Sequence, residues 1–150
     1  MGKISDYIAK LEAADEETQD RALLAIIKKY EDKLVALNQD QLFHGRDSNG
    51  GSLREYTLNT YNGLKYALFK NRMNSEPGFG IRDYKLKGSF YEGFFVDAEQ
   101  FPVTIGSNDS KTTFLIKGDS LFGLDDDSLK EFLEAIKTDV QEYYRSLLQF

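Results

Sequence analysis

The residues best suited to chemistry are a serine and a histidine, but their order in the chain does not make them a catalytic pair. Ser120 follows an apolar run within Gly-Asp-Ser-Leu, a setting that would suit a hydrolytic nucleophile. A serine attacks a carbonyl only when a positioned base takes its proton. The single histidine, His44, lies upstream, and no histidine occurs among the 29 residues after Leu121. We interpret the segment as a loop before a helix, and His44 as a helix cap or surface residue.

The chain also lacks the residues that most metal and cofactor sites require. The chain has no cysteine and one histidine, which removes thiolate and multi-histidine sites. The acidic segments 47–49 and 125–127 do not match the ligand spacing of a calcium loop, and a turn and a helix cap explain them. The glycines match neither nucleotide-binding fingerprint. We expect no cofactor and no metal.

Carboxylates leave one catalytic class open. The chain holds 25 aspartates and glutamates, and paired carboxylates hydrolyse glycosides when they lie at the right separation. No pair stands out in the sequence. A small carboxylate-dependent hydrolase therefore remains an alternative reading.

Long helices are expected at both ends of the chain. Over residues 17–43 and 126–149, apolar residues recur at intervals of three and four, the pattern of a helix with one buried face. A shorter helix is expected over 6–14. Ser128 and Glu131 have the spacing of a capping box for the last helix. Its predicted apolar stripe consists of Leu129, Leu133, Ile136, Val140, Tyr143 and Leu147.

The centre of the chain is expected to hold a helix and short strands. Glycines, Asp47 and Asn49 predict a loop over 44–52. A helix follows over 57–73, with Thr57 as its N-cap, and then a mobile loop over 74–80. Strands are expected within 81–107, with a hairpin turning near residues 98–100, while 112–117 fit strand or helix equally. The apolar stripe of the central helix is Leu58, Tyr61, Leu64 and Leu68, with Tyr66, Phe69 and Met73 beside it.

These elements define one domain of the α+β class, a small antiparallel sheet packed with long N- and C-terminal helices. A chain of 150 residues is long enough to bury a substantial core. No stretch approaches the roughly 20 apolar residues that span a bilayer, so no membrane association is expected.

The charge is unevenly distributed. Residues 1–75 hold 11 basic and 11 acidic side chains, whereas 76–150 hold 8 and 14, and segment 54–87 has a net charge of +4. A basic centre between acidic flanks suits head-to-tail association of identical subunits, and a solvated face is the plainer reading. The candidate interface residues are Arg54, Lys65, Lys70, Arg72, Arg82, Lys85 and Lys87 on the basic side, and Asp125, Asp126 and Asp127 on the acidic side.

Short motifs over residues 45–107 resemble a known family. Their order is an Asp-Gly turn, an apolar residue, a threonine, a helix with a lysine, and an extended segment containing glycine and serine. The residues that carry it are Asp47 to Gly50, Leu53, Tyr56, Thr57, Lys65, Tyr84 to Phe90, Gly93 and Phe94, with Gly50 and Gly88 as the motif glycines. This order is similar to that of phage virion-morphogenesis and tail-completion proteins. The sequence departs from the family pattern after Ile105.

The resemblance implies a structural role without catalysis. It implies a small α+β subunit of the virion, assembled in the host cytoplasm, that forms a ring as a head–tail connector or tail-completion protein. Its partners would be copies of itself and portal, connector or tail proteins. DNA would pass through the ring without specific binding, because tight phosphate contacts would hinder passage. A monomeric adaptor or inhibitor that binds a partner through its tyrosines is the other alternative.

Overall fold

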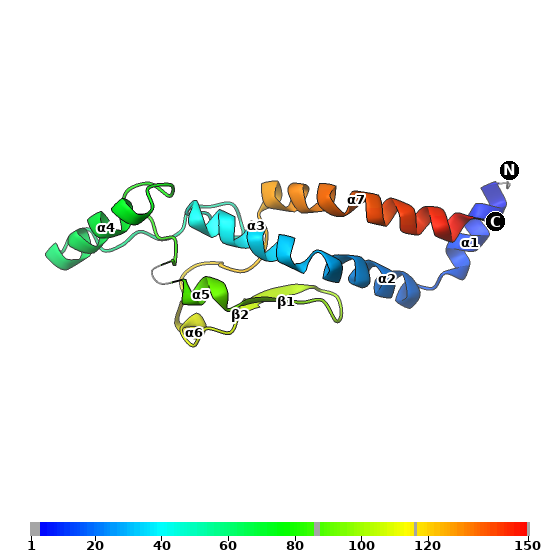
Figure 1. Cartoon of the computed structure of the whole chain (residues 1–150), viewed down its shortest axis with the longest axis horizontal. Helices are drawn as coiled ribbons and strands as arrows, with labels where there is room; N and C mark the ends of the chain where they lie inside the picture. Colours follow the sequence, from blue (N-terminus) through cyan, green and yellow to red (C-terminus); the bar gives the residue numbers. More distant parts are fainter. Residues whose placement is uncertain (1–3, 86–87, 116, 150) are drawn as a thin grey trace.

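The computed structural model describes residues 4–85, 88–115 and 117–149, and within them the chain forms seven helices and one two-stranded antiparallel sheet. Figure 1 shows an elongated molecule with α4 (Tyr61–Met73) at one end and both termini at the other. The prediction of an α+β fold with long N- and C-terminal helices is confirmed. No helix in the described ranges is both long and apolar enough to cross a membrane.

The N-terminal part consists of α1 (Ile4–Ala13), α2 (Glu16–Lys29) and α3 (Glu31–Phe43). The prediction of one continuous helix over 17–43 is wrong, because the helix breaks at Tyr30, where φ is −109° and ψ is 23°. The Tyr30 N–H donates to the Ile27 carbonyl at 2.9 Å, a tightened last turn, and α3 continues directly from it. The sequence pattern does not reveal this break, because the apolar spacing continues across it and no glycine or proline occurs there.

The C-terminal helix α7 (Asp126–Leu148) runs antiparallel to α2 and α3 and packs along both (Figure 1). Its N-cap is Asp125, whose side chain accepts the Ser128 N–H at 2.8 Å. The predicted capping box is therefore wrong, because Ser128 is already the third residue of the helix. Capping by an aspartate at the positive end of the helix dipole stabilises this start.

One of two apolar clusters joins α3 to α7. Leu34 and Leu37 pack with Phe132 and Ile136, and each of the four is at most 7% exposed. Two leucines of the expected stripe lie largely outside the core, since Leu129 is 43% and Leu133 is 52% exposed. The periodicity therefore identifies the helix correctly, but only part of the stripe belongs to the core.

The sheet is a single hairpin, β1 (Phe94–Asp97) with β2 (Thr104–Ser107), paired from Phe94↔Ser107 to Asp97↔Thr104. The predicted turn near residues 98–100 is confirmed. A strand over 81–87 is not found in its described part, where Ile81 forms only an isolated bridge to Glu55, and 86–87 lie outside the described residues.

Two short helices replace other expected strands. Helix α5 (Ser89–Glu92) occupies the segment just before β1, and α6 (Thr112–Leu115) resolves the open choice over 112–117 in favour of helix, with residue 116 outside the described residues. Gly88, a motif glycine within the region expected to hold strands, is the N-cap of α5, with φ of 84°. This left-handed conformation favours glycine.

The second apolar cluster lies below α3 and holds the middle of the molecule together. It consists of Leu42, Leu53, Phe90, Tyr91 and Leu121, each at most 7% exposed. Residues 44–52 form a loop, as predicted, and Asp47 Oδ1 accepts the N–H groups of Asn49 and Gly51 at 2.9 Å. Asp47 thus supports a turn, and Gly50 takes its φ of 82° within that turn.

Two buried amides of α3 hold the loop that leads into α7. Asn38 Nδ2 donates to the Leu121 carbonyl at 2.8 Å, and Asn38 Oδ1 accepts the Gly123 N–H at 3.0 Å. Gln41 bonds the Gly123 carbonyl at 2.7 Å and the Asp125 N–H at 3.1 Å. Both amides are 0% exposed, so these four bonds satisfy backbone groups that would otherwise be buried without partners.

Candidate subunit interface

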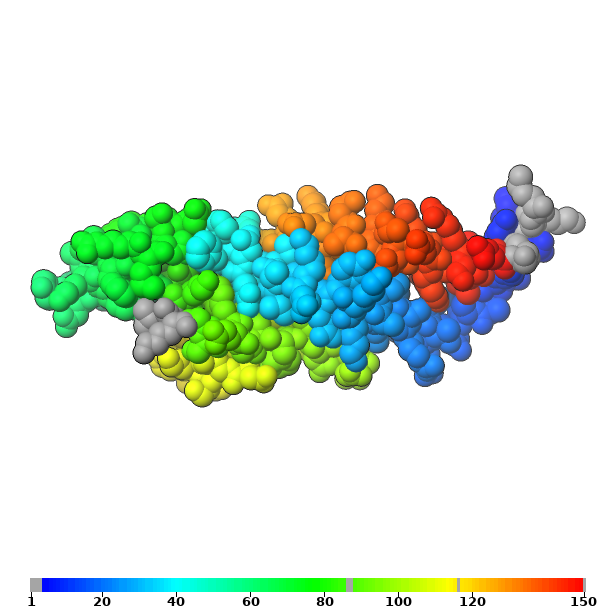
Figure 2. Space-filling view, viewed as in Figure 1, coloured from blue at the N-terminus to red at the C-terminus, as the bar shows by residue number. Residues whose placement is uncertain are grey.

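Helix α4 projects from the body of the molecule and is the first part of the candidate site (Figures 1 and 2). Its N-cap is Thr60, whose hydroxyl accepts the Gly63 N–H at 3.1 Å, so the prediction of Thr57 as the cap is wrong. The chain at Thr57 passes close to the first turn of the helix. A Cβ at Gly63 would lie only 1.7 Å from the Thr57 carbonyl oxygen. Only glycine permits this close approach.

The apolar residues of α4 face solvent rather than the body. The inward stripe is formed by Gly63, Ala67, Lys70 and Asn74, at spacings of four, three and four. The outward residues, each between 38% and 78% exposed, are Tyr61, Leu64, Tyr66, Leu68, Phe69 and Met73. The predicted apolar stripe is therefore found, except for Leu58, which precedes the helix, and it makes no core. The outward side carries two apolar rows with Lys65 and Arg72 between them, and apolar side chains exposed in this number are typical of an interaction surface.

A buried ion pair attaches α4 in this orientation. Lys70 Nζ lies 2.8 Å from Asp83 Oδ1 and donates to the Lys85 carbonyl at 2.6 Å. Asn74 Nδ2 donates to Asp83 Oδ2 at 3.0 Å and to the Phe43 carbonyl at 2.8 Å. Lys70 is only 4% exposed, so its charge is neutralised within the chain. The interpretation of Lys70 as an interface residue is wrong for this reason.

A hollow of about 540 Å³ lies at the base of α4. Tyr56 and Tyr66 meet edge to face there, with ring centroids 5.2 Å apart, and the Arg82 guanidinium lies 5.3 Å from the centre of the Tyr56 ring. Burial raises the pKa of Tyr56 and the pKa of Tyr66, which keeps both hydroxyls neutral. The wall of the hollow therefore combines neutral aromatic rings with basic side chains, which are those of Lys70, Arg82, Lys85 and Lys111.

The remaining basic candidates fall into two groups. Arg54 Nε lies 3.2 Å from Asp119 Oδ2, and Arg82 Nε donates to the Glu55 carbonyl at 3.3 Å, so both side chains have partners in their own chain. Lys65 and Arg72 are exposed on the outward side of α4, between its two rows of apolar residues. Lys85 is also exposed, near the Phe43 and Tyr91 rings, and Lys87 lies outside the described residues.

The acidic candidates are not brought to α4. Asp125 is 4% exposed, caps α7 and lies 3.3 Å from Arg46, so the structure removes it from the surface set. Asp126 and Asp127 are exposed in the first turn of α7, which Figure 1 places beside α3. The basic and acidic candidates of one copy therefore lie apart, as a contact between copies requires.

The residues considered for catalysis serve local structure. Asp119, next to Ser120, accepts hydrogen bonds from Arg54 and from the Tyr84 hydroxyl. His44 caps the end of α3, as expected, with Nδ1 2.8 Å from the Asp40 carbonyl oxygen. Within the described ranges, no group of three or more histidine, aspartate or glutamate residues is arranged to hold a metal ion.

Sequence reasoning missed the outward orientation of α4. The signal was present in Gly63 and Ala67, small residues at a spacing of four that allow a helix to approach its support closely. No protein-family model matches the chain, and neither a curated protein nor a solved structure shows significant similarity to it.

Proposed function

We propose that the protein is a structural subunit of a phage virion, a head–tail connector or tail-completion protein that acts by binding copies of itself. The observation that carries the proposal is the apolar face of α4, with Leu64, Leu68, Phe69 and Met73 each between 41% and 52% exposed. A monomeric protein seldom leaves such a surface uncovered. The proposed activity is assembly, and the proposal assigns no reaction and no cofactor to the chain.

The shape of the molecule supports a contact between different surfaces of neighbouring copies. Helix α4 is found at one end only (Figure 1), so a pair of copies joined through α4 and an unlike surface still has one free α4 and one free acceptor surface. Such heterologous contacts close into a ring when the rotation between copies permits it. The exposed cations Lys65 and Arg72, which lie between the apolar rows of α4, would add orientation and charge selectivity.

The virion assignment rests on the motif resemblance over residues 45–107, and its partners would be portal, connector or tail proteins. Assembly would take place in the host cytoplasm, and DNA would pass through the ring without specific contacts. Immunogold labelling of the phage that encodes the chain tests this finer part. Label at the junction of head and tail supports it, and particles without label contradict it.

Sedimentation velocity over a concentration series tests the assembly itself. We expect the wild-type chain to form larger species as concentration rises, and Leu68→Asp to abolish them. Leu133→Asp is the matched control, because Leu133 on α7 is 52% exposed against 48% for Leu68. A wild-type chain that stays monomeric throughout would contradict the proposal and favour a monomeric adaptor.

A further inference from the structure

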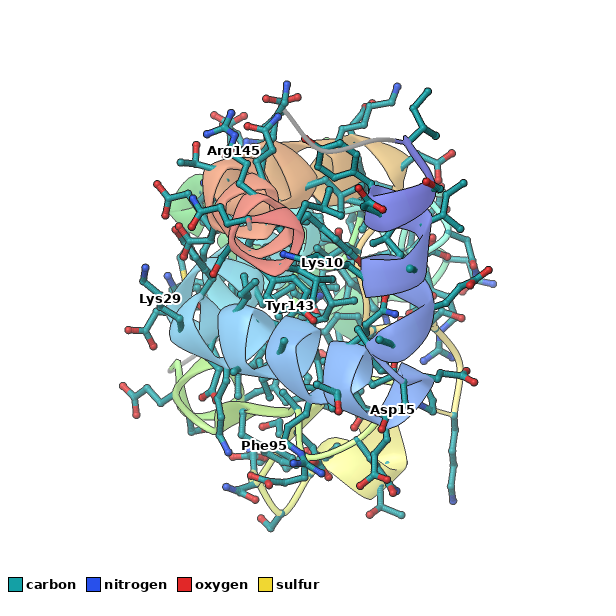
Figure 3. The ribbon with its side chains drawn as sticks, turned by 90° about the vertical axis from the view of Figure 1, so that its right-hand side faces the viewer. Lys10, Asp15, Lys29, Phe95, Tyr143 and Arg145 are labelled. Atoms are coloured by element: carbon teal, nitrogen blue, oxygen red, sulfur yellow. The ribbon has the colours of Figure 1, made fainter. Side chains whose placement is uncertain are left out.

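The half of the molecule opposite α4 carries an acidic groove. It has a volume of about 860 Å³ and lies between the start of α2 and the turn of the hairpin. Figure 3 looks onto this end and shows Asp15 at the corner between α1 and α2, with the strand that carries Phe95 below α2. The charged residues of the groove are Asp15, Glu16, Glu17, Asp20, Arg21 and Glu99, a formal charge of −4.

These carboxylates are only partly neutralised within the chain. Arg21 lies 2.8 Å from Glu17 along the exposed surface of α2, and Lys28 binds Glu99 at the rim. Asp15 accepts the Thr18 N–H as the N-cap of α2, and this hydrogen bond lowers its pKa, so the carboxylate stays ionised. For Glu16 and Asp20, no ion pair is found among the described residues. The groove thus retains negative charge for a basic partner.

The groove also offers apolar contact. Leu24 and Phe101 line it, and the Phe101 side chain is 44% exposed. Helix α4 presents the complementary combination, because Lys65 and Arg72 lie on its outward side between the row of Leu64 and Leu68 and the row of Phe69 and Met73. These two cations are seven residues apart, about 10 Å along the helix axis and on the same side of it. Charge and apolar character therefore match between the two surfaces.

We propose that α4 of one copy docks into the acidic groove between α2 and the hairpin turn of the next copy. The inference rests on the proposed function and names the acceptor surface for it. Each surface keeps two carboxylates without an ion pair among the described residues, Glu16 and Asp20 in the groove and Asp126 and Asp127 at the start of α7. The groove is favoured because it is a hollow in which Leu24 and Phe101 add apolar contact. Since donor and acceptor lie in opposite halves of the molecule, the contact is heterologous (Figure 1).

Cysteine cross-linking locates the contact, because the chain has no cysteine of its own. Leu68→Cys is mixed with Gln100→Cys, a neutral position in the groove, and oxidised under conditions where the wild type assembles. We expect a disulfide-linked dimer from this mixture. The comparison mixtures, Leu68→Cys with Asp127→Cys and with Lys137→Cys, are expected to stay unlinked. A link to position 127 instead of 100 would overturn the inference and leave the proposed function standing.

A charge exchange gives an independent readout. Lys65→Glu with Arg72→Glu makes both surfaces acidic. Glu16→Lys, Glu17→Lys and Asp20→Lys together change the formal charge of the groove from −4 to +2 and leave α4 basic. Each variant alone is expected to assemble about tenfold or more weakly, since like charges then face each other. An equimolar mixture is expected to recover assembly, because each copy then meets a complementary neighbour. Variants that assemble like the wild type, or a mixture that does not recover, would overturn the inference, while a monomeric wild type would overturn the proposed function as well.

Discussion

The Nζ atom of Lys70 lies 2.8 Å from Oδ1 of Asp83, and the two side chains are only 5% and 3% exposed. This pair fixes which side of α4 faces the body. Once Lys70 is directed inward with Ala67, the leucines and aromatic residues of the helix must point outward. The exposed apolar surface is therefore a consequence of a buried polar contact.

Removing the lysine should destabilise the fold. Lys70→Met leaves Asp83 buried without its counter-charge, and breaking such a pair typically costs about 3–5 kcal/mol. Urea unfolding followed by circular dichroism measures the loss in free energy of unfolding. Lys65→Met, on the exposed side of the same helix, is the control and should unfold like the wild type. Equal stability of both variants would show that the pair does not anchor α4.

Two neighbouring apolar residues of α7 should respond differently to truncation. Ile136→Ala empties a site that is 7% exposed, and it should lower the free energy of unfolding by about 2–5 kcal/mol. Leu133→Ala, at a 52% exposed position, should change the stability far less. Thermal and urea denaturation compare the two. A larger loss at Leu133 would contradict the packing of α7 on α3.

The buried amide of Asn38 should matter more than its size suggests. Asn38→Ala leaves the Leu121 carbonyl and the Gly123 N–H without their partner, at a cost of about 1–3 kcal/mol for each buried group. Hydrogen exchange should also quicken in the loop 121–125. The exposed Asn62 provides the control, as Asn62→Ala should leave both readouts unchanged. If Asn38→Ala is as stable as the wild type, the hydrogen bonds from Asn38 to the loop do not contribute to the stability of the fold.

Alkaline pH should weaken the fold through its buried tyrosines. Burial raises the pKa of Tyr91, which donates its hydroxyl to the Asp83 carbonyl at 2.6 Å. The pKa of Tyr91 is higher in the folded chain than the value of about 10 expected in the unfolded chain. The contribution of Tyr91 to the free energy of unfolding is therefore fully present below about pH 10 and decreases as the pH rises above it. Urea unfolding at rising alkaline pH should show this fall, and Tyr91→Phe should make it shallower. An identical slope in the variant would contradict the assignment.

Periodicity and turn chemistry were sufficient for the long elements. The spacing of Ile136 and its neighbours identified α7, and the glycines and Asp47 identified the loop over 44–52. The break at Tyr30 could not be found this way, because it changes neither the apolar spacing nor the residue types that usually end a helix.

The candidate site was harder to predict, because its residues reverse the usual preferences. Apolar residues are usually assigned to the core and lysines to the surface, yet Lys70 is buried and Leu68 is exposed. Only the tertiary partner, Asp83, makes that arrangement favourable. The acidic run at Asp15 to Glu17 can be read in the sequence, but its juxtaposition with Glu99 depends on how the hairpin packs under α2.

A cryo-electron microscopy reconstruction of the assembled protein tests the account most directly. It should place α4 of each copy between subunits, with Leu68 and Phe69 covered by the neighbour. A reconstruction in which α4 points into solvent, and the copies meet through other surfaces, would contradict it.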